Sequence, residues 1–164
     1  MSIPFLRWGI LGTGNIAGKF AKDLVKLGDR ARLVAVGSRD RTSAETFRDA
    51  HGADYAFGSY AEVLACAEVD AVYISLPNHL HREWSIAASK AGQHVLCEKP
   101  AGMVAAEVAE MTAAAKQADR FWMEAFAYRC HPRYARLAEI IANDLLGEIR
   151  LAHATFCFDG STMG

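Results

Sequence analysis

Short apolar runs alternate with amphipathic stretches along most of the chain. The apolar runs predict strands over residues 6–11, 33–37, 55–57, 71–76, 94–97 and 121–125. Strands that alternate with helices are typical of βαβ units, and the near-continuous apolar run at 71–76 is typical of a strand buried on both faces. The pattern therefore predicts an α/β fold built on a doubly wound parallel sheet, the Rossmann arrangement.

The amphipathic stretches predict the intervening helices, which cover residues 15–27, 78–92, 104–118 and 132–143, with two more that begin near residues 42 and 59. The first helix carries an apolar stripe at helical spacing, formed by Ile16, Phe20, Leu24 and Leu27. We expect this stripe to face the core. Gly28 follows it as a residue that can end the helix in a left-handed conformation.

Polar residues mark the beginnings of several helices. Thr42 is followed after three residues by Glu45, and Ser59 is followed in the same way by Glu62. This spacing is typical of a capping box, in which the two side chains pair with backbone N–H groups of the first helical turn. Asn78 is expected to cap the next helix.

The rhythm changes after residue 125. Pro132 is suited to the first position of a helix, and Gly147 with Glu148 predicts a turn. A strand is predicted from Ile149 to residue 158, but it would have no later strand with which to pair. We therefore expect residues 1–125 to form the Rossmann domain and residues 126–164 to begin a C-terminal α+β domain that is truncated here.

Composition and charge narrow the range of functions. The chain has 164 residues, of which 52% are hydrophobic and 23% charged, and this suits one ordinary domain with a buried core. The formal net charge of −1 offers no electrostatic basis for binding nucleic acid or an anionic membrane. No apolar run approaches the ~20 residues that span a bilayer. The first residues lack the basic segment and apolar core of a secretion signal, so a cytoplasmic location is expected.

The cysteines and histidines predict no metal site. No two of the four cysteines have the spacing of a metal or redox motif, and we interpret them as free thiols, three of them buried in apolar stretches. His79 and His81 would point to different faces of a helix, which is unsuited to binding one metal ion.

A glycine-rich loop follows the first predicted strand and opens the first predicted helix. Its residues are Gly12, Thr13, Gly14, Asn15, Ile16 and Ala17, and they match the pattern G-x-G-x-x-G/A. Gly12 permits a tight turn, Gly14 lets the backbone approach a pyrophosphate, and Ala17 keeps the helix close to the sheet. The N-terminus of the helix would present unpaired N–H groups to the anion. We interpret the loop as a dinucleotide-binding site; the alternative is a glycine turn in another α/β fold.

The residues after the second predicted strand bear on the choice of cofactor. An acidic residue at this strand end would bind the ribose 2′-hydroxyl of NAD, but the chain continues Gly37-Ser38-Arg39-Asp40-Arg41. Ser38 can donate a hydrogen bond to a 2′-phosphate, and Arg39 can clamp that phosphate or stack on adenine. Alternatively, Asp40 can turn towards a ribose and the arginines can be solvated surface charges. The pattern favours NADP, with NAD as the alternative.

Three further motifs lie at the ends of predicted strands. They are Leu76-Pro77-Asn78-His79-Leu80-His81, Glu98-Lys99-Pro100 and Met123-Glu124-Ala125-Phe126-Ala127-Tyr128-Arg129. Together with the loop at Gly12, they resemble the N-terminal part of the Gfo/Idh/MocA oxidoreductases. The last motif, with Pro132 and the segment 146–150, is most similar to the branch of dimeric dihydrodiol dehydrogenase and glucose–fructose oxidoreductase. The resemblance covers essentially the whole chain, and Glu-Lys-Pro is its most specific marker.

This resemblance implies a two-domain enzyme of about twice this length. Its second domain would carry the substrate specificity and the subunit interface, so the full-length form is expected to be a homo-oligomer that acts on a small molecule. Lys99 would lie near the nicotinamide and stabilise the reacting oxygen or relay its proton as hydride moves; the alternative is an ordinary surface lysine. Glu98 would bind the ribose or hold the structure through hydrogen bonds.

The resemblance also implies further cofactor contacts. Leu76, Pro77 and Asn78 would pack along the cofactor between adenosine and ribose, and Asn78 can cap a helix as well. His81 resembles the cofactor-side histidine of the family, with an exposed residue in the first turn of a helix as the alternative. Arg129 would contact the cofactor or form an interdomain salt bridge.

The activity implied by the resemblance is NADP-dependent hydride transfer to or from a hydroxyl or carbonyl of a sugar, polyol or cyclic diol. The alternative is a non-catalytic dinucleotide-binding sensor or regulatory protein of the same family. Lys99 argues against this alternative, because a sensor does not need its amine. Without a second domain, the chain as given is expected to bind the cofactor but not to catalyse.

Overall fold

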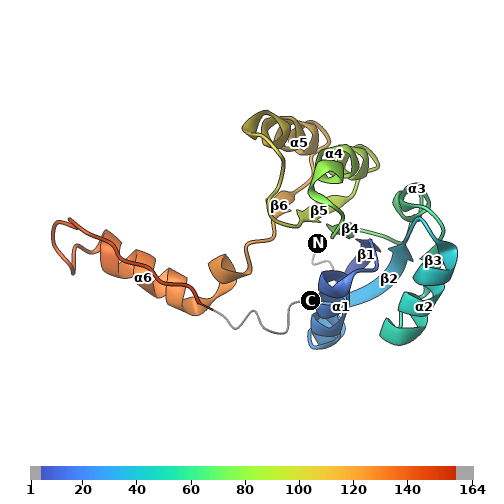
Figure 1. Cartoon of the computed structure of the whole chain (residues 1–164), viewed down its shortest axis with the longest axis horizontal. Helices are drawn as coiled ribbons and strands as arrows, with labels where there is room; N and C mark the ends of the chain where they lie inside the picture. Colours follow the sequence, from blue (N-terminus) through green and yellow to red (C-terminus); the bar gives the residue numbers. More distant parts are fainter. Residues whose placement is uncertain (1–4, 158–164) are drawn as a thin grey trace. The chain divides into compact units, whose positions relative to one another are not determined.

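Within residues 5–157, which the computed structural model describes, six parallel strands form one sheet in the order β3-β2-β1-β4-β5-β6 (Figure 1). Their bounds are β1 Leu6–Leu11, β2 Ala31–Gly37, β3 Tyr55–Phe57, β4 Ala71–Ile74, β5 His94–Cys97 and β6 Trp122–Glu124. This strand order is that of the Rossmann fold, so the predicted doubly wound parallel sheet is confirmed.

Helices cover both faces of the sheet. The α-helices are α1 Asn15–Val25, α2 Arg41–His51, α3 Tyr60–Leu64, α4 His81–Lys90, α5 Ala105–Gln117 and α6 Pro132–Ala142, and the short 3₁₀ turns are η1 Gly28–Arg30, η2 Asn78–Leu80 and η3 Ala127–Cys130. Figure 1 shows α1 and α2 on one side of the sheet and α4 and α5 on the other. Each face has its own apolar core: one is shared with α1 and α2, the other with α3 and α4.

The buried stripe of α1 differs from the predicted one. Ile16 is 44% and Leu27 39% exposed, whereas Ala17 and Ala21 are buried beside Leu24. The prediction weighted the large apolar residues, but the small alanines are the ones that let α1 approach the sheet closely. Ala17 therefore lies where the loop pattern predicts it.

Two of the three predicted helix caps are wrong. Asp40, and not Thr42, caps α2: its carboxylate accepts hydrogen bonds from the backbone N–H groups of Thr42 and Ser43. Ser59 caps α3 as predicted and accepts from the N–H of Glu62. Asn78 begins η2, and the residue before α4 is Leu80, which provides no side-chain cap.

The chain divides into two units between Phe126 and Ala127. In the second unit α6 begins at Pro132, as predicted. The strand predicted from Ile149 is wrong for the residues that the structure describes, because 151–157 form no regular structure, and residue 158 lies outside the described range. A strand requires a partner for its backbone groups, and none of the described segments provides one.

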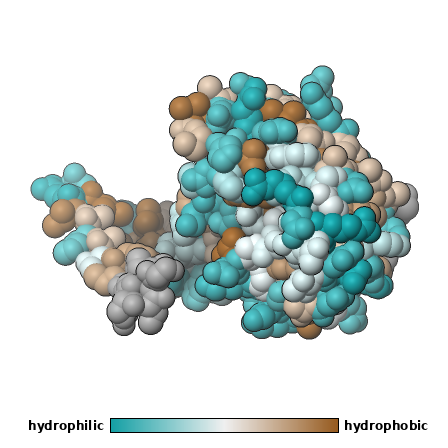
Figure 2. Space-filling view, turned by 45° about the vertical axis from the view of Figure 1, so that its right-hand side comes forward, coloured by the Kyte–Doolittle hydropathy of each residue, from teal (hydrophilic) through white to brown (hydrophobic). Residues whose placement is uncertain are grey.

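The surface of the described chain is mainly polar on the face shown in Figure 2. Among the described helices, none combines the length and the apolar character needed to cross a membrane. All four thiols are free, but only Cys97 is buried; Cys66 is half-buried, and Cys130 and Cys157 are exposed. The prediction of three buried thiols is therefore wrong. Both exposed thiols belong to the second unit, in which no described residue is buried.

Candidate functional site

The carboxyl ends of the parallel strands lie at one edge of the sheet, and backbone hydrogen bonds extend beyond the strands there. The N–H of Gly12 donates to the carbonyl of Gly37 over 2.9 Å, and the N–H of Glu98 donates to that of Ile74 over 2.9 Å. Strands β1 and β4 are neighbours, and the strand order reverses between them. In open α/β sheets a crevice for ligands forms at this switch point.

Gly12 is required by the fold itself. Its φ of +102° is rarely adopted by residues with a side chain. A Cβ at this position would lie 3.0 Å from Oγ of Ser75 and 3.2 Å from the side chain of Leu76. The loop therefore turns tightly against the end of β4, the strand next to β5, which carries Glu98 and Lys99.

Gly14 has no such structural requirement. Its backbone is extended, with φ −74° and ψ 177°, and among the described residues a Cβ here would meet no atom within 4 Å. It precedes α1 without providing a side-chain cap, and the first turn of α1 carries no acidic residue. The N-terminus of α1 thus offers N–H groups and the positive end of its dipole beside open space, which fits the phosphate groups of a dinucleotide.

Polar residues follow β2 at the same edge. Ser38 is half-buried and Arg39 exposed, and within residues 5–157 the guanidinium of Arg39 forms no hydrogen bond or ion pair. The carboxylate of Asp40 is occupied: besides capping α2, it accepts from the hydroxyl of Ser43 over 2.6 Å. These hydrogen bonds, with that of the Ser43 hydroxyl the strongest, hold the pKa of Asp40 below its usual value.

A cavity of about 470 Å³ opens between the end of β2, the start of α3 and the start of α4. It is lined by Arg39, Gly58, Ser59, Tyr60, His79, Leu80, Glu83 and Trp84. The rings of Tyr60 and Trp84 meet edge to face, with centroids 5.1 Å apart. The sequence did not predict this cavity. The signal available was an aromatic pair, Tyr60 and Trp84, near the starts of the helices that follow β3 and β4.

The segment after β4 places its three predicted cofactor residues differently. Leu76 is buried, with 6% exposure, whereas Pro77 and Asn78 are exposed. His81 is fully buried, so the alternative of an exposed helix residue is wrong. Its ring nitrogens face two backbone carbonyls of the chain.

Glu98 and Lys99 follow β5. One carboxylate oxygen of Glu98 accepts a hydrogen bond from the phenol of Tyr73, and the other accepts from the N–H of Lys99 over 3.1 Å. The side chain of Lys99 is exposed, and its amine forms no hydrogen bond or ion pair in the part of the chain that the structure describes. Glu98 therefore holds the backbone at Lys99 and leaves the amine free at the carboxyl edge.

Arg129 lies in η3 of the second unit and is exposed. The residues of the first unit that meet at the carboxyl edge are those of the loop, the end of β2, and the segments after β4 and β5. The structure brings no three potential metal-ligating side chains together within its described residues.

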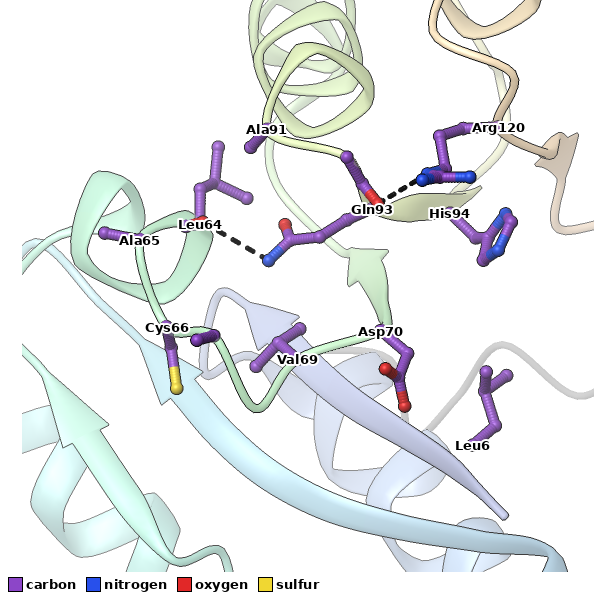
Figure 3. Close-up of a pocket in the computed structure, with 12 residues that line it drawn as sticks. Leu6, Leu64, Ala65, Cys66, Val69, Asp70, Ala91, Gln93, His94 and Arg120 are labelled. Carbon is purple, nitrogen blue, oxygen red and sulfur yellow. Dashed lines mark hydrogen bonds between the residues drawn. The ribbon is translucent and has the colours of Figure 1, made fainter. Parts of the chain in front are cut away.

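Another cavity, of about 450 Å³, opens at the opposite edge of the sheet, where the strands begin (Figure 3). The side-chain amide of Gln93 donates to the carbonyl of Leu64, at the end of α3. Arg120 donates to the carbonyl of Gly92, just after α4, over 2.6 Å. These side chains satisfy carbonyl groups at helix C-termini, as bound water otherwise would. We assign this cavity no part in cofactor binding.

Two curated relatives match nearly the whole chain. D-xylose 1-dehydrogenase (NADP(+)) 2 of Haloferax volcanii is 40% identical over 153 residues, which cover 93% of this chain and 46% of that protein. Trans-1,2-dihydrobenzene-1,2-diol dehydrogenase of Mus musculus is 39% identical over 155 residues, which cover 94% of this chain and 46% of that protein. The chain thus spans about half the length of these relatives.

A solved structure and a family model agree with these matches. The crystal structure of an NAD binding oxidoreductase from Klebsiella pneumoniae has a TM-score of 0.82 and 33% identity, covering 88% of this chain and 40% of that one. The model of the Gfo/Idh/MocA family, described as an oxidoreductase family with an NAD-binding Rossmann fold, matches residues 6–126. A match over most of the chain, on a Rossmann sheet with an open glycine loop at the switch point, shows that this chain belongs to the Gfo/Idh/MocA oxidoreductases.

Proposed function

We propose that this chain is the NADP-binding part of an oxidoreductase that transfers hydride between nicotinamide and a hydroxyl or carbonyl of a sugar, polyol or cyclic diol. The observation that carries the proposal is made at Gly14, where a Cβ would meet no atom of residues 5–157 within 4 Å, so that these residues leave open space at the N-terminus of α1. A bound nicotinamide supplies the hydride; the protein supplies position and charge. The other residues of the first unit to which we assign roles lie at the edge of the sheet where the strands end.

The pyrophosphate would lie against the backbone of Thr13, Gly14, Asn15 and Ile16 at the start of α1. The adenosine would then extend towards the cavity beside Arg39, and Leu76, Pro77 and Asn78 would line the path between this end and the nicotinamide. Arg39 and Ser38 would bind the 2′-phosphate, because a guanidinium pairs well with phosphate oxygens. Asp40 supports NADP over NAD, since its hydrogen bonds to Thr42 and Ser43 direct its carboxylate to the N-terminus of α2 rather than towards a ribose.

Lys99 is the residue that we assign to catalysis. Its backbone is held by Glu98, and its amine has no partner within residues 5–157, so the amine can hydrogen-bond the reacting oxygen and stabilise or relay its proton. For Arg129, in the second unit, a cofactor contact is a prediction from the family resemblance alone. The second unit, which begins at Ala127, would start the domain that binds substrate and joins subunits.

The names of the relatives support the substrate class. D-xylose and trans-1,2-dihydrobenzene-1,2-diol both carry neighbouring hydroxyl groups on a small ring or chain. The relatives are about twice as long as this chain, so the substrate itself is assigned only by class. The homo-oligomeric state of a longer form and its cytoplasmic location remain predictions.

Titration of the chain with NADPH and with NADH, followed by tryptophan fluorescence, tests the proposal. We expect saturable binding with a clear preference for NADPH and no turnover of sugars or diols by the chain alone. A longer form that contains a second domain is expected to oxidise some members of a sugar and diol panel. Binding in both forms with turnover in neither would favour the sensor, and absence of binding would contradict the proposal.

A further inference from the structure

His81 is a completely buried imidazole at the first position of α4. Its Nε2 lies 2.8 Å from the carbonyl oxygen of Leu76, and its Nδ1 lies 2.9 Å from the carbonyl oxygen of Pro100. Both distances are short enough for hydrogen bonds, and a ring nitrogen that carries a proton donates to the carbonyl that it faces. A ring with one N–H bonds to one of the two carbonyls, and a ring with two N–H groups bonds to both. Both ring nitrogens are therefore directed at the protein's own backbone.

The two carbonyls belong to the two segments that carry the proposed cofactor and catalytic residues. Leu76 directly precedes Pro77 and Asn78 after β4, and Pro100 directly follows Lys99 after β5. Strands β4 and β5 are paired in parallel, so their ends are neighbours. The imidazole of His81 thus lies between the two segments, with one nitrogen against the carbonyl of each, beyond the point where the strand ladder stops.

Other side chains hold the rest of the segment after β5. The N–H of Ala101 donates to Oε1 of Glu124 over 2.9 Å, and the N–H of Met103 donates to Oε2 of Glu107 over 2.7 Å. Glu124 comes from the end of β6 and Glu107 from the first turn of α5. Among these contacts, that of His81 is the one that ties the segment to the end of β4; its nitrogen towards Leu76 is in a buried contact and its nitrogen towards Pro100 in a part-buried one.

We propose that His81 is a positioning residue that sets the place of the Lys99 amine relative to the cofactor, by holding the backbone of Pro100 against that of Leu76, rather than a residue that touches the cofactor itself. Only one part of this proposal, the place of the Lys99 amine relative to the cofactor, rests on the proposed function. The order that His81 imposes on the backbone after β5 is a property of the chain alone. The direction of the amine towards a bound dinucleotide is what links that order to chemistry.

The two ring nitrogens can be tested separately. In His81→Asn the amide nitrogen replaces Nδ1 and keeps a donor for Pro100, whereas in His81→Gln it replaces Nε2 and keeps a donor for Leu76. Ser89→Ala is the matched control, because Ser89 is equally buried in α4 and its hydroxyl bonds only within the helix, to the carbonyl of Ser85.

The first measurement is hydrogen exchange of the Ala101 and Met103 amides, without cofactor. We expect His81→Gln to accelerate exchange at Ala101 by about tenfold or more, with smaller effects in His81→Asn and none in Ser89→Ala. Equal acceleration in both His81 variants, or none in His81→Gln, would overturn the proposal. If the His81 variants do not fold, the wild-type chain decides: a slowly exchanging imidazole N–H of His81 supports the proposal, and a rapidly exchanging one contradicts it.

The second measurement is labelling of the Lys99 amine with an acylating reagent, read by mass spectrometry with and without NADPH. In the wild-type chain and in His81→Asn, NADPH is expected to slow labelling at Lys99. In His81→Gln this protection is expected to be lost while the Kd for NADPH changes less than about threefold, a split that general destabilisation would not produce. If the wild-type chain does not bind NADPH, the proposed function is refuted, whereas the result of the exchange measurement still stands.

Discussion

The phenol of Tyr73 on β4 donates a hydrogen bond to Oε1 of Glu98 at the end of β5, over 2.5 Å. Tyr73 is 2% exposed, and its ring stacks on Phe20 of α1 with centroids 3.9 Å apart. The core under the glycine-rich loop is thus connected through one hydrogen bond to the carboxylate that holds the backbone of Lys99. A buried phenol needs such a partner, and Glu98 fulfils this structural role whether or not it also binds a ribose.

Removal of the Tyr73 hydroxyl is expected to lower the free energy of unfolding by an amount that depends on pH. Burial, and then the bond to Glu98, raise the pKa of Tyr73 above its usual value of 10.0. A raised pKa in the folded state means that the contribution of Tyr73 is fully present below pH 10 and is lost as the pH rises further. Tyr73→Phe is therefore expected to lower the free energy of unfolding by about 1–2 kcal/mol at pH 8. Urea unfolding at pH 8 and above pH 10 checks this: a difference that does not shrink at the higher pH contradicts the assignment.

Gly14→Ser is expected to separate folding from binding. Serine is a slightly better helix cap than glycine, so the variant should unfold at an equal or slightly higher temperature, with a gain of roughly a few tenths of a kcal/mol. The added side chain enters the space that the phosphates would occupy, so the affinity for NADPH is expected to fall by about tenfold or more. Thermal unfolding and fluorescence titration measure the two effects.

Gly12→Ala is the matched control for that experiment. At a φ of +102° and with Ser75 so close, the alanine is expected to destabilise the fold by about 1–3 kcal/mol. If Gly14→Ser destabilised the chain as much as Gly12→Ala while binding NADPH normally, Gly14 would have a structural role and the binding site would lie elsewhere.

Arg39→Ala is expected to weaken NADPH binding by about tenfold or more and to leave NADH binding nearly unchanged, because only NADPH carries the 2′-phosphate. Arg41→Ala serves as the control, since its guanidinium pairs with Glu45 on the outer face of α2. Calorimetric titration of both variants with both cofactors gives the comparison. A similar loss for NADPH and NADH in Arg39→Ala would assign Arg39 to adenine stacking instead.

The ion pair between Arg7 and Asp70 is expected to contribute to acid resistance. The guanidinium of Arg7 donates to both carboxylate oxygens of Asp70, over 2.7 and 2.9 Å, and holds the pKa of Asp70 below its usual value of 3.8. A lowered pKa means that the stabilisation is present above about pH 4 and is lost as the pH falls further. Unfolding free energies measured between pH 6 and pH 2.5 should show this component in the wild-type chain and not in Arg7→Gln or Asp70→Asn. An identical acid dependence in all three would contradict it.

Local sequence signals predicted the parts of the site that depend on neighbouring residues. The glycine loop, the cap at Ser59 and the Glu98–Lys99 pair at a strand end all fall where the sequence places them. The cap of α2 was misassigned, because Asp40 and Thr42 are both good caps and only the backbone geometry selects between them.

Contacts between distant segments could not be predicted in this way. The contacts of buried His81, the bond from Tyr73 to Glu98 and the cavity beside Arg39 each bring together residues that belong to or follow different strands. No periodicity or spacing encodes such pairs, since they arise only when parallel strands align their ends.

The sequence by itself determined the class of sheet, the glycine-rich loop and the family, because alternating apolar runs and a glycine pattern follow from the order of residues along the chain. Only the tertiary structure decided which polar groups remain free. It occupies Asp40 with a helix and both nitrogens of His81 with backbone carbonyls, and it leaves Arg39 and the amine of Lys99 without a protein partner among the described residues. The physical reason is that a polar side chain satisfies its hydrogen bonds with whatever the fold brings near it, and the chain folded in space determines those neighbours.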